Sequence, residues 1–188
     1  MDKVESLKKN KKIAEVLSSR KAKYIIGTTL LSGIGIALPR IFHVLAGASA
    51  GATFLPMHIA VLIAALTFGI TSGAVVAGSS IIFSYLLTGM PTLARLPYML
   101  IELVIYAVIL KIFNKKFNKV ISLAATIILG RILYAGVLFV SINVLGLQTY
   151  GISVIESIKV GLPGIAIQLV CVPIIAKLMS ERLNLKND

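Results

Sequence analysis

Glu102 and Arg131 lie inside long apolar stretches of this sequence, where ionisable side chains are rare. A charge in membrane hydrocarbon costs at least ~2.5 kcal/mol, so each group needs a partner or a wet cavity. At ~1.5 Å of rise per helical residue, the two groups lie at depths that allow them to pair. Such a pair either fixes the register of two helices or contacts a ligand directly, and the two roles are compatible.

Two histidines at predicted helix ends, His43 and His58, form a second group of interest, with Phe42 and Met57 beside them in the sequence. A pair of histidines can contribute to a zinc site, but no cysteine or carboxylate lies near them in the sequence. We therefore expect no metal. Hydrogen bonding to a ligand, or capping of helix ends at the membrane interface, is the interpretation that we favour.

A third group closes the next long apolar stretch. Tyr85, Thr88, Met90 and Arg95 offer an aromatic ring, a hydroxyl, a thioether and one positive charge. This mixture suits a small amphipathic ligand. Simple packing between helices is the alternative for Tyr85 and Met90.

No catalytic motif accompanies these groups. The sequence contains no His-Glu-x-x-His, no Gly-x-Ser-x-Gly and no Walker motif, so we expect no catalytic residue and no ATP hydrolysis by this chain alone. Two other hypotheses stay open. A small intramembrane enzyme would use His43, His58 and Glu102 for proton transfer, whereas a solitary ion-coupled transporter would use Glu102 as its protonation site.

The elements that must position these residues are membrane helices. Hydrophobic residues make up 57% of the chain and charged residues 14%, and the mean hydropathy is +0.96, which a soluble core of 188 residues cannot hide. We predict an all-α integral membrane protein with six transmembrane helices. A basic segment, 1–23, precedes the membrane domain, 24–180, and a tail, 181–188, follows it. The predicted spans are 24–45, two within 54–91, 96–113, 120–145 and 155–179.

The second and third spans form a hairpin whose turn is expected around Gly69 to Gly73. The polar ends of this hairpin, which carry His58 and Thr88, then lie at one membrane face. A pocket at that face is the simplest use for them.

The first span carries small residues on one helical face, at Thr29, Gly33 and Ala37. This pattern lets another membrane helix approach closely, so we expect that face to pack against a partner helix. The run 46–54 is rich in glycine and alanine and predicts a flexible connection or a lid.

Basic residues are distributed unevenly between the two predicted sides of the membrane. Fifteen of the nineteen Lys and Arg residues fall in the N-terminal segment, after the fourth span and at the C-terminus, whereas Arg40, Arg95 and Lys159 fall on the other side. The positive-inside rule therefore places both termini in the cytoplasm and the hairpin's polar ends outside. Because the basic residues are not interleaved with aromatic residues, we expect no nucleic-acid partner.

Several short motifs occur together along the first five spans. They are Leu38-Pro39 with Phe42-His43, Phe54 to Ile59, Ser84 to Pro91, Leu96-Pro97 with Glu102-Leu103 and Tyr106, and Gly130-Arg131. In combination they resemble the substrate-binding S components of energy-coupling factor transporters. The sixth span fits that family by hydropathy only, and Thr29 and Gly33 stand where the family often has an Ala-x-x-x-Ala contact for its scaffold.

The resemblance implies a multi-pass subunit of a prokaryotic plasma-membrane importer that captures a vitamin or related micronutrient outside the cell without changing it chemically. It implies partners as well: a membrane scaffold subunit and two ATP-binding-cassette ATPases, which use the ATP, with no cofactor in this chain. It also implies that the subunit topples within the bilayer to turn its pocket inward. The substrate-binding residues that we predict are Phe42, His43, Met57, His58, Tyr85, Thr88, Met90, Arg95 and Glu102, with Arg131 supporting Glu102.

Overall fold

The regular elements of the protein are helices throughout the described residues, which are 19–47, 50–143 and 154–185 of a computed structural model. Residues 1–18, which make up most of the predicted basic segment, lie outside this range, as do residues 144–153 and the end of the predicted tail. The helices are α2 (Arg20–Ala46), α3 (Ala50–Phe54), α4 (Pro56–Phe68), α5 (Ile70–Thr88), α6 (Leu96–Asn114), α7 (Lys119–Asn143) and α8 (Val154–Arg182).

Six helical segments in the described part of the chain are long and apolar enough to cross a membrane, with α3 and α4 counted together as one. The predicted number of spans and the all-helical fold are confirmed. Large aliphatic side chains face outward along these helices, among them Leu30, Ile128 and Val170. Such a surface is unfavourable in water and favourable in lipid, so the chain is a multi-pass membrane protein.

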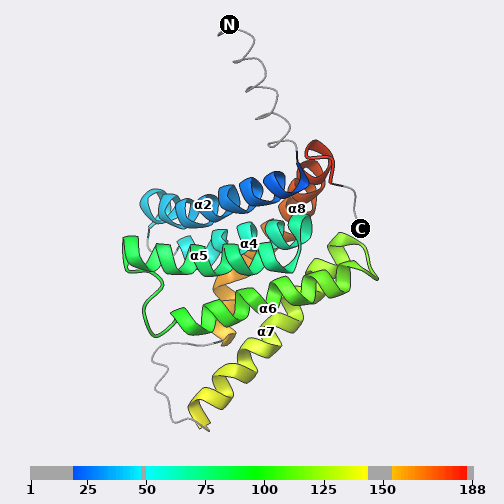
Figure 1. Ribbon diagram of the computed structural model, residues 1–188. Helices are drawn as coiled ribbons and strands as arrows, with labels where there is room; N and C mark the ends of the chain where they lie inside the picture. Colours follow the sequence, from blue (N-terminus) through cyan, green and yellow to red (C-terminus); the bar gives the residue numbers. More distant parts are fainter. Residues whose placement is uncertain (1–18, 48–49, 144–153, 186–188) are drawn as a thin grey trace, which may run out of the picture.

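Helix α4 occupies the centre of the molecule. Ten of its thirteen residues are buried, and it contacts α2, α5, α6 and α8. Its sequence is apolar on all sides, as expected for a helix enclosed by other helices. Figure 1 shows α2, α5, α6 and α7 following one another down the molecule, crossed by α8 in orange and red. The first turn of α4 is therefore held on several sides, which matters because it carries His58.

Small and hydroxylated residues allow α2 and α5 to pack closely. Thr28 and Ser72 share a hydrogen bond of 2.6 Å, and the Ser79 hydroxyl donates to Ser32 Oγ at 2.8 Å. Gly35 faces Ser80 so closely that a Cβ there would overlap its hydroxyl. Hydrogen bonds and close backbone approach of this kind hold helices together where lipid offers no hydrophobic driving force.

The small-residue face predicted on the first span is not the one that packs internally. Thr29, Gly33 and Ala37 are exposed, and a Cβ on Gly33 would meet no described atom within 4 Å. The face of α2 that packs against the other helices includes Gly27 and Gly35 instead. The predicted face is thus open on the surface of the described chain.

Two local predictions are corrected by the structure. The predicted turn from Gly69 to Gly73 is a single residue, Gly69, whose φ of 97° is strongly disfavoured for residues other than glycine. Gly73 lies inside α5, where a Cβ would stand 2.6 Å from Ala107 Cβ. In the run 46–54, residues 50–54 form α3 rather than a flexible connection.

Helix boundaries shift the predicted domain limits slightly. Ser19 caps α2 by accepting a hydrogen bond from the Ala22 N–H at 3.2 Å, so the first span begins at Arg20, within the predicted basic segment. Helix α8 extends to Arg182, past the predicted limit of the membrane domain at residue 180. At both predicted limits, after residues 23 and 180, the sequence changes between polar and apolar residues inside a helix and not at its end.

The two ends of the described chain lie together. The Lys23 ammonium group donates to the Leu183 carbonyl at 3.0 Å, which joins the start of α2 to the end of α8 (Figure 1). The C-terminal end of α6 and the start of α7 lie on this side too, because Lys119 and Lys177 line one cavity. We call this side the lysine-rich end; it carries Lys23, Lys111, Lys115, Lys116, Lys119 and Lys177.

Candidate functional site

A cavity of about 300 Å³ lies at the end of the helices opposite the lysine-rich end. Its walls come from α2 to α7 and from the connection between α5 and α6. Both polar ends of the predicted hairpin contribute, so the expected pocket between them is present. Eight predicted residues line it: His43, Met57, His58, Thr88, Met90, Arg95, Glu102 and Arg131.

A buried ion pair lies at the inner end of this cavity. Arg131 Nη1 of α7 is 3.0 Å from Glu102 Oε1 of α6, and both side chains are less than a tenth exposed. The Tyr106 hydroxyl, one helical turn from Glu102, donates to the same carboxylate oxygen at 3.1 Å. The predicted pairing of Glu102 with Arg131 is confirmed. An unpaired charge at this depth would be costly, and the contacts with Arg131 and Tyr106 together fix the carboxylate in one orientation.

Gly130 explains why Tyr106 can reach this position. A Cβ on Gly130 would overlap the ring of Tyr106, so only the absence of a side chain lets the ring lie against α7. The neighbouring residue, Arg131, then extends past the ring to Glu102. The Gly130-Arg131 pair therefore serves one purpose: the glycine makes room for the tyrosine, and the arginine meets the carboxylate.

His58 faces the free side of the carboxylate. Its Nε2 lies 4.0 Å from Glu102 Oε2, which is too far for a hydrogen bond. Neither ring nitrogen of this buried side chain has a hydrogen-bond partner among the described residues. The ring lies edge-on to Tyr106, with centroids 5.8 Å apart. Because an unsatisfied buried polar group costs ~1–3 kcal/mol, a ligand group that bonds to His58 would recover that cost.

The start of α4 determines the position of His58. Leu55 adopts a left-handed conformation with φ 50°, and Pro56 occupies the first helical turn, where its missing N–H costs nothing. The two residues separate α3 from α4. His58, in that first turn, is thereby directed to the cavity rather than to lipid.

Helix α3 forms one wall of the cavity through Gly51 and Ala52. It packs against α8, where a Cβ on Gly164 would stand 2.7 Å from backbone atoms of Thr53 and Phe54. A glycine is needed at this crossing because backbone atoms cannot move aside as a flexible side chain can. The wall is therefore fixed by α8, although no described side chain of that helix lines the cavity.

Two predicted residues are not brought into the cavity. The Phe42 ring packs on Phe54, with centroids 5.1 Å apart, and helps to hold α3 against α2. Tyr85 is half-buried but does not line the cavity. Both were predicted as ligand contacts from their neighbours in the sequence. On a helix, however, the residue next to a lining residue points about a quarter turn away.

Several lining residues were missed by the sequence analysis. Tyr134 lies one turn after Arg131 on the same face of α7, a spacing that could have identified it. Arg40 reaches the cavity from α2 but was counted only as a charge on the outer side. Ser84 lies one turn before Thr88 on α5, so its helical spacing could also have identified it, whereas Met99 comes from α6, whose placement against α5 the sequence does not reveal.

Three arginines, Arg40, Arg95 and Arg131, line the cavity, and Glu102 is the one carboxylate among its described lining residues. Guanidinium groups form strong hydrogen bonds with carboxylates and phosphates, so this lining can bind a small molecule with an anionic group. In the described part of the chain, no three His, Cys, Asp or Glu side chains gather in a way that could hold a metal ion.

Comparison of the chain with models of protein families, with curated proteins and with solved structures found no match. The fold and the site define a multi-pass helical membrane protein with a largely apolar cavity that ends in a buried ion pair.

Proposed function

We propose that this chain is the substrate-binding S component of an energy-coupling factor importer and captures a vitamin or related micronutrient without altering it. The observation that carries the proposal is the cavity of about 300 Å³ that ends at Glu102, Arg131 and His58. Its volume is at the lower end of the range for small-molecule sites, and a few convergent polar groups in a largely apolar wall are typical of such sites.

The chemistry of the cavity narrows the ligand. Its guanidinium groups favour an anionic group such as a carboxylate, and Arg40 and Arg95 lie at its exposed end. At its inner end, the Glu102 carboxylate and the His58 ring face each other across 4.0 Å. A ligand hydroxyl suits this inner end because it can both donate and accept a hydrogen bond. The ligand that we propose is a small acid with a hydroxyl group at the other end.

The partners follow from the same proposal. A membrane scaffold subunit would pack on the open face of α2 formed by Thr29, Gly33 and Ala37, where small side chains allow close contact. Two ATP-binding-cassette ATPases would supply the energy for release inside the cell. The orientation that we propose is the one from the positive-inside rule, with the lysine-rich end in the cytoplasm of a prokaryotic cell and the cavity facing outward.

Native mass spectrometry of the detergent-purified full chain, taken from cells grown in rich medium, tests this proposal. We expect a retained, chemically intact small acid, whose mass identifies it. The Glu102→Gln variant should retain much less of it, whereas Glu181→Gln, a matched change at the opposite end, should retain as much as the wild type. Equal retention by a folded Glu102→Gln variant would remove Glu102 from the ligand site.

Two other outcomes would replace the proposal. A chemically altered compound after incubation with the purified chain would indicate an enzyme. Uptake of the same compound by the isolated chain in ATP-free vesicles, driven by an ion gradient, would indicate a solitary transporter. A binding subunit gives neither result, because it needs its ATPase partners for net uptake.

A further inference from the structure

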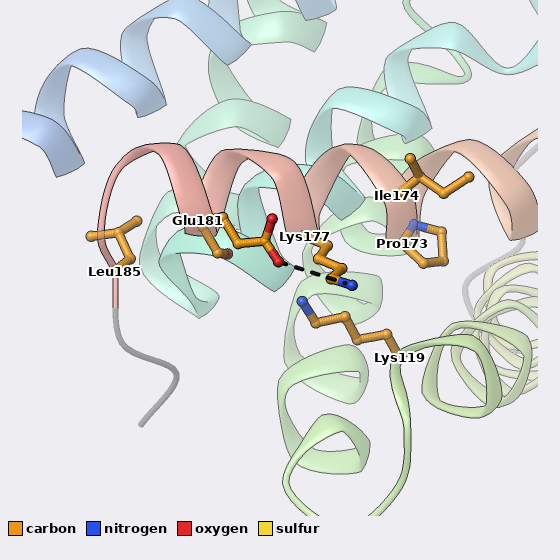
Figure 2. Close-up of a pocket in the computed structure, with 7 residues that line it drawn as sticks. Lys119, Pro173, Ile174, Lys177, Glu181 and Leu185 are labelled. Carbon is orange, nitrogen blue, oxygen red and sulfur yellow. Dashed lines mark ion pairs between the residues drawn. The ribbon is translucent and has the colours of Figure 1, made fainter.

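A second cavity, of about 470 Å³, lies at the lysine-rich end between the first turn of α7 and the last turns of α8. It is separate from the site described above and independent of the function proposed for that site. Lys119 lines it from α7, and Pro173, Ile174, Lys177 and Glu181 line it from α8 (Figure 2).

Two positive charges meet in this cavity. Figure 2 shows the ammonium groups of Lys119 and Lys177 extending from different helices toward the same space. Glu181 lies 3.9 Å from Lys177, but this pair is largely exposed and such pairs contribute little. Among the described residues no carboxylate forms an ion pair with Lys119. The cavity therefore keeps a net positive charge that an anion would neutralise.

The apolar side of the cavity continues into the lipid-facing surface. Ile174 is 53% exposed, and Val170 and Leu178, one turn before and after it on the same stripe of α8, are 61% and 52% exposed. On α7, the exposed residues Val120 and Ile121 follow Lys119 directly. The cavity thus lies where charged side chains give way to aliphatic ones, which is the depth of lipid headgroups.

We propose that this cavity binds an anionic phospholipid. Its headgroup phosphate lies between Lys119 and Lys177, and an acyl chain lies along Val170, Ile174 and Leu178. A free phosphate ion offers the same charge to the lysines but makes no use of the apolar stripe, which is why the structure favours the lipid. Because the two lysines come from different helices, the bound lipid links the start of α7 to the end of α8.

Native mass spectrometry of the purified full chain in detergent, with added phosphatidylglycerol or phosphatidylcholine of identical acyl chains, tests the proposal. We expect phosphatidylglycerol to bind in preference to phosphatidylcholine. The Lys119→Gln/Lys177→Gln variant should bind phosphatidylglycerol about thirtyfold more weakly. Each lysine near an anionic lipid contributes about five- to sixfold in affinity, so the two together contribute about thirtyfold, which is about 2 kcal/mol.

A matched control removes the same charge from the same end. Lys115 and Lys116 are exposed in the turn before α7 and do not line the cavity, so Lys115→Gln/Lys116→Gln should bind phosphatidylglycerol within about threefold of the wild type. The charge-conserving variant Lys119→Arg/Lys177→Arg should also retain binding. It separates loss of charge from loss of fold.

Three results would overturn the proposal. Equal weakening by the two glutamine variants would indicate diffuse attraction to surface charge rather than a site. In phosphatidylcholine the choline group cancels the phosphate charge. Equal binding of this lipid would show that the cavity does not recognise the net negative charge of the headgroup. Complete displacement of phosphatidylglycerol by inorganic phosphate at a similar concentration would identify a free-anion site, with the acyl chain contributing nothing.

Discussion

At the scale of single residues, the site is organised by the Glu102 carboxylate. One oxygen receives both Arg131 and Tyr106, at 3.0 and 3.1 Å, and the other faces His58 without a hydrogen bond. The carboxylate is thus held by the protein on one side and left available on the other. Oε1 makes the structural link to Arg131, and the ligand contact that we propose would use Oε2.

Removing one member of the pair should destabilise the protein more than removing both. We expect Glu102→Gln and Arg131→Gln each to lower the free energy of unfolding by ~3–5 kcal/mol, because each leaves the other charge buried and unpaired. The double variant should lose much less than the sum. Reversible unfolding in mixed detergent micelles measures all three. Strictly additive losses would mean that the two charges do not interact. As a control, Glu181→Gln removes a charge from the exposed pair with Lys177 and should change the free energy of unfolding little.

A methyl group on Gly130 should disturb the same site from the other helix. Gly130→Ala forces the Tyr106 ring away from α7, at an expected cost of ~1–3 kcal/mol for overpacking. Gly136→Ala provides the control on the same helix, since a Cβ there would meet no described atom within 4 Å. Thermal unfolding of both variants checks this. If Gly136→Ala were as destabilising as Gly130→Ala, the cost would come from the helix itself and not from contact with Tyr106.

At the scale of helices, α3 shows how a short element depends on a distant one. Its five residues read as a loop from sequence, because glycine and alanine in a row suggest a connection. The helix packs on α8, where Gly164 admits its backbone. More than a hundred residues separate the two in the chain. No local pattern can predict such a contact, which is why the cavity wall formed by Gly51 and Ala52 was missed.

The crossing of α3 and α8 can be tested with two glycines of α8, one turn apart. A Cβ on Gly164 would meet backbone atoms at 2.7 Å, whereas a Cβ on Gly161 would meet the end of the Leu55 side chain at 3.1 Å. Gly164→Ala should therefore displace α3 and weaken ligand retention in native mass spectra, by tenfold or more. Gly161→Ala should change retention little, because Leu55 can adjust. Equal effects would show that α3 is not held by this contact.

The long helices, in contrast, were predictable. Apolar stretches of sufficient length determine membrane spans, and the bounds of α6 and α7 differ from the predicted spans by at most two residues. The pairing of Glu102 with Arg131 was predictable for the same physical reason, since buried charges require partners. The contribution of Arg40 was not, because it depends on how separate helices face one cavity.

At the scale of the whole molecule, the two ends of the helix bundle differ in kind. The lysine-rich end carries the open, basic cavity beside α8, and the opposite end carries the cavity with the buried ion pair. Cytoplasmic loops of membrane proteins carry an excess of Lys and Arg, so this asymmetry predicts one orientation of the chain. The proposed capture of a ligand from outside requires that orientation, so it is the property of the whole chain that most needs measurement.

Cysteine labelling of intact cells determines the orientation. Cys171, the one cysteine of the chain, is replaced by serine, and single cysteines are then introduced at Ala94, exposed near the ligand cavity, or at Lys116, exposed at the lysine-rich end. A membrane-impermeant maleimide should label Ala94→Cys in intact cells, and Lys116→Cys only after the membrane is permeabilised, because the positive-inside rule places the lysines in the cytoplasm. The reverse pattern would turn the ligand cavity toward the cytoplasm and exclude capture from outside. Labelling of both sites in intact cells would indicate mixed orientations, which an importer subunit with one docking partner could not use.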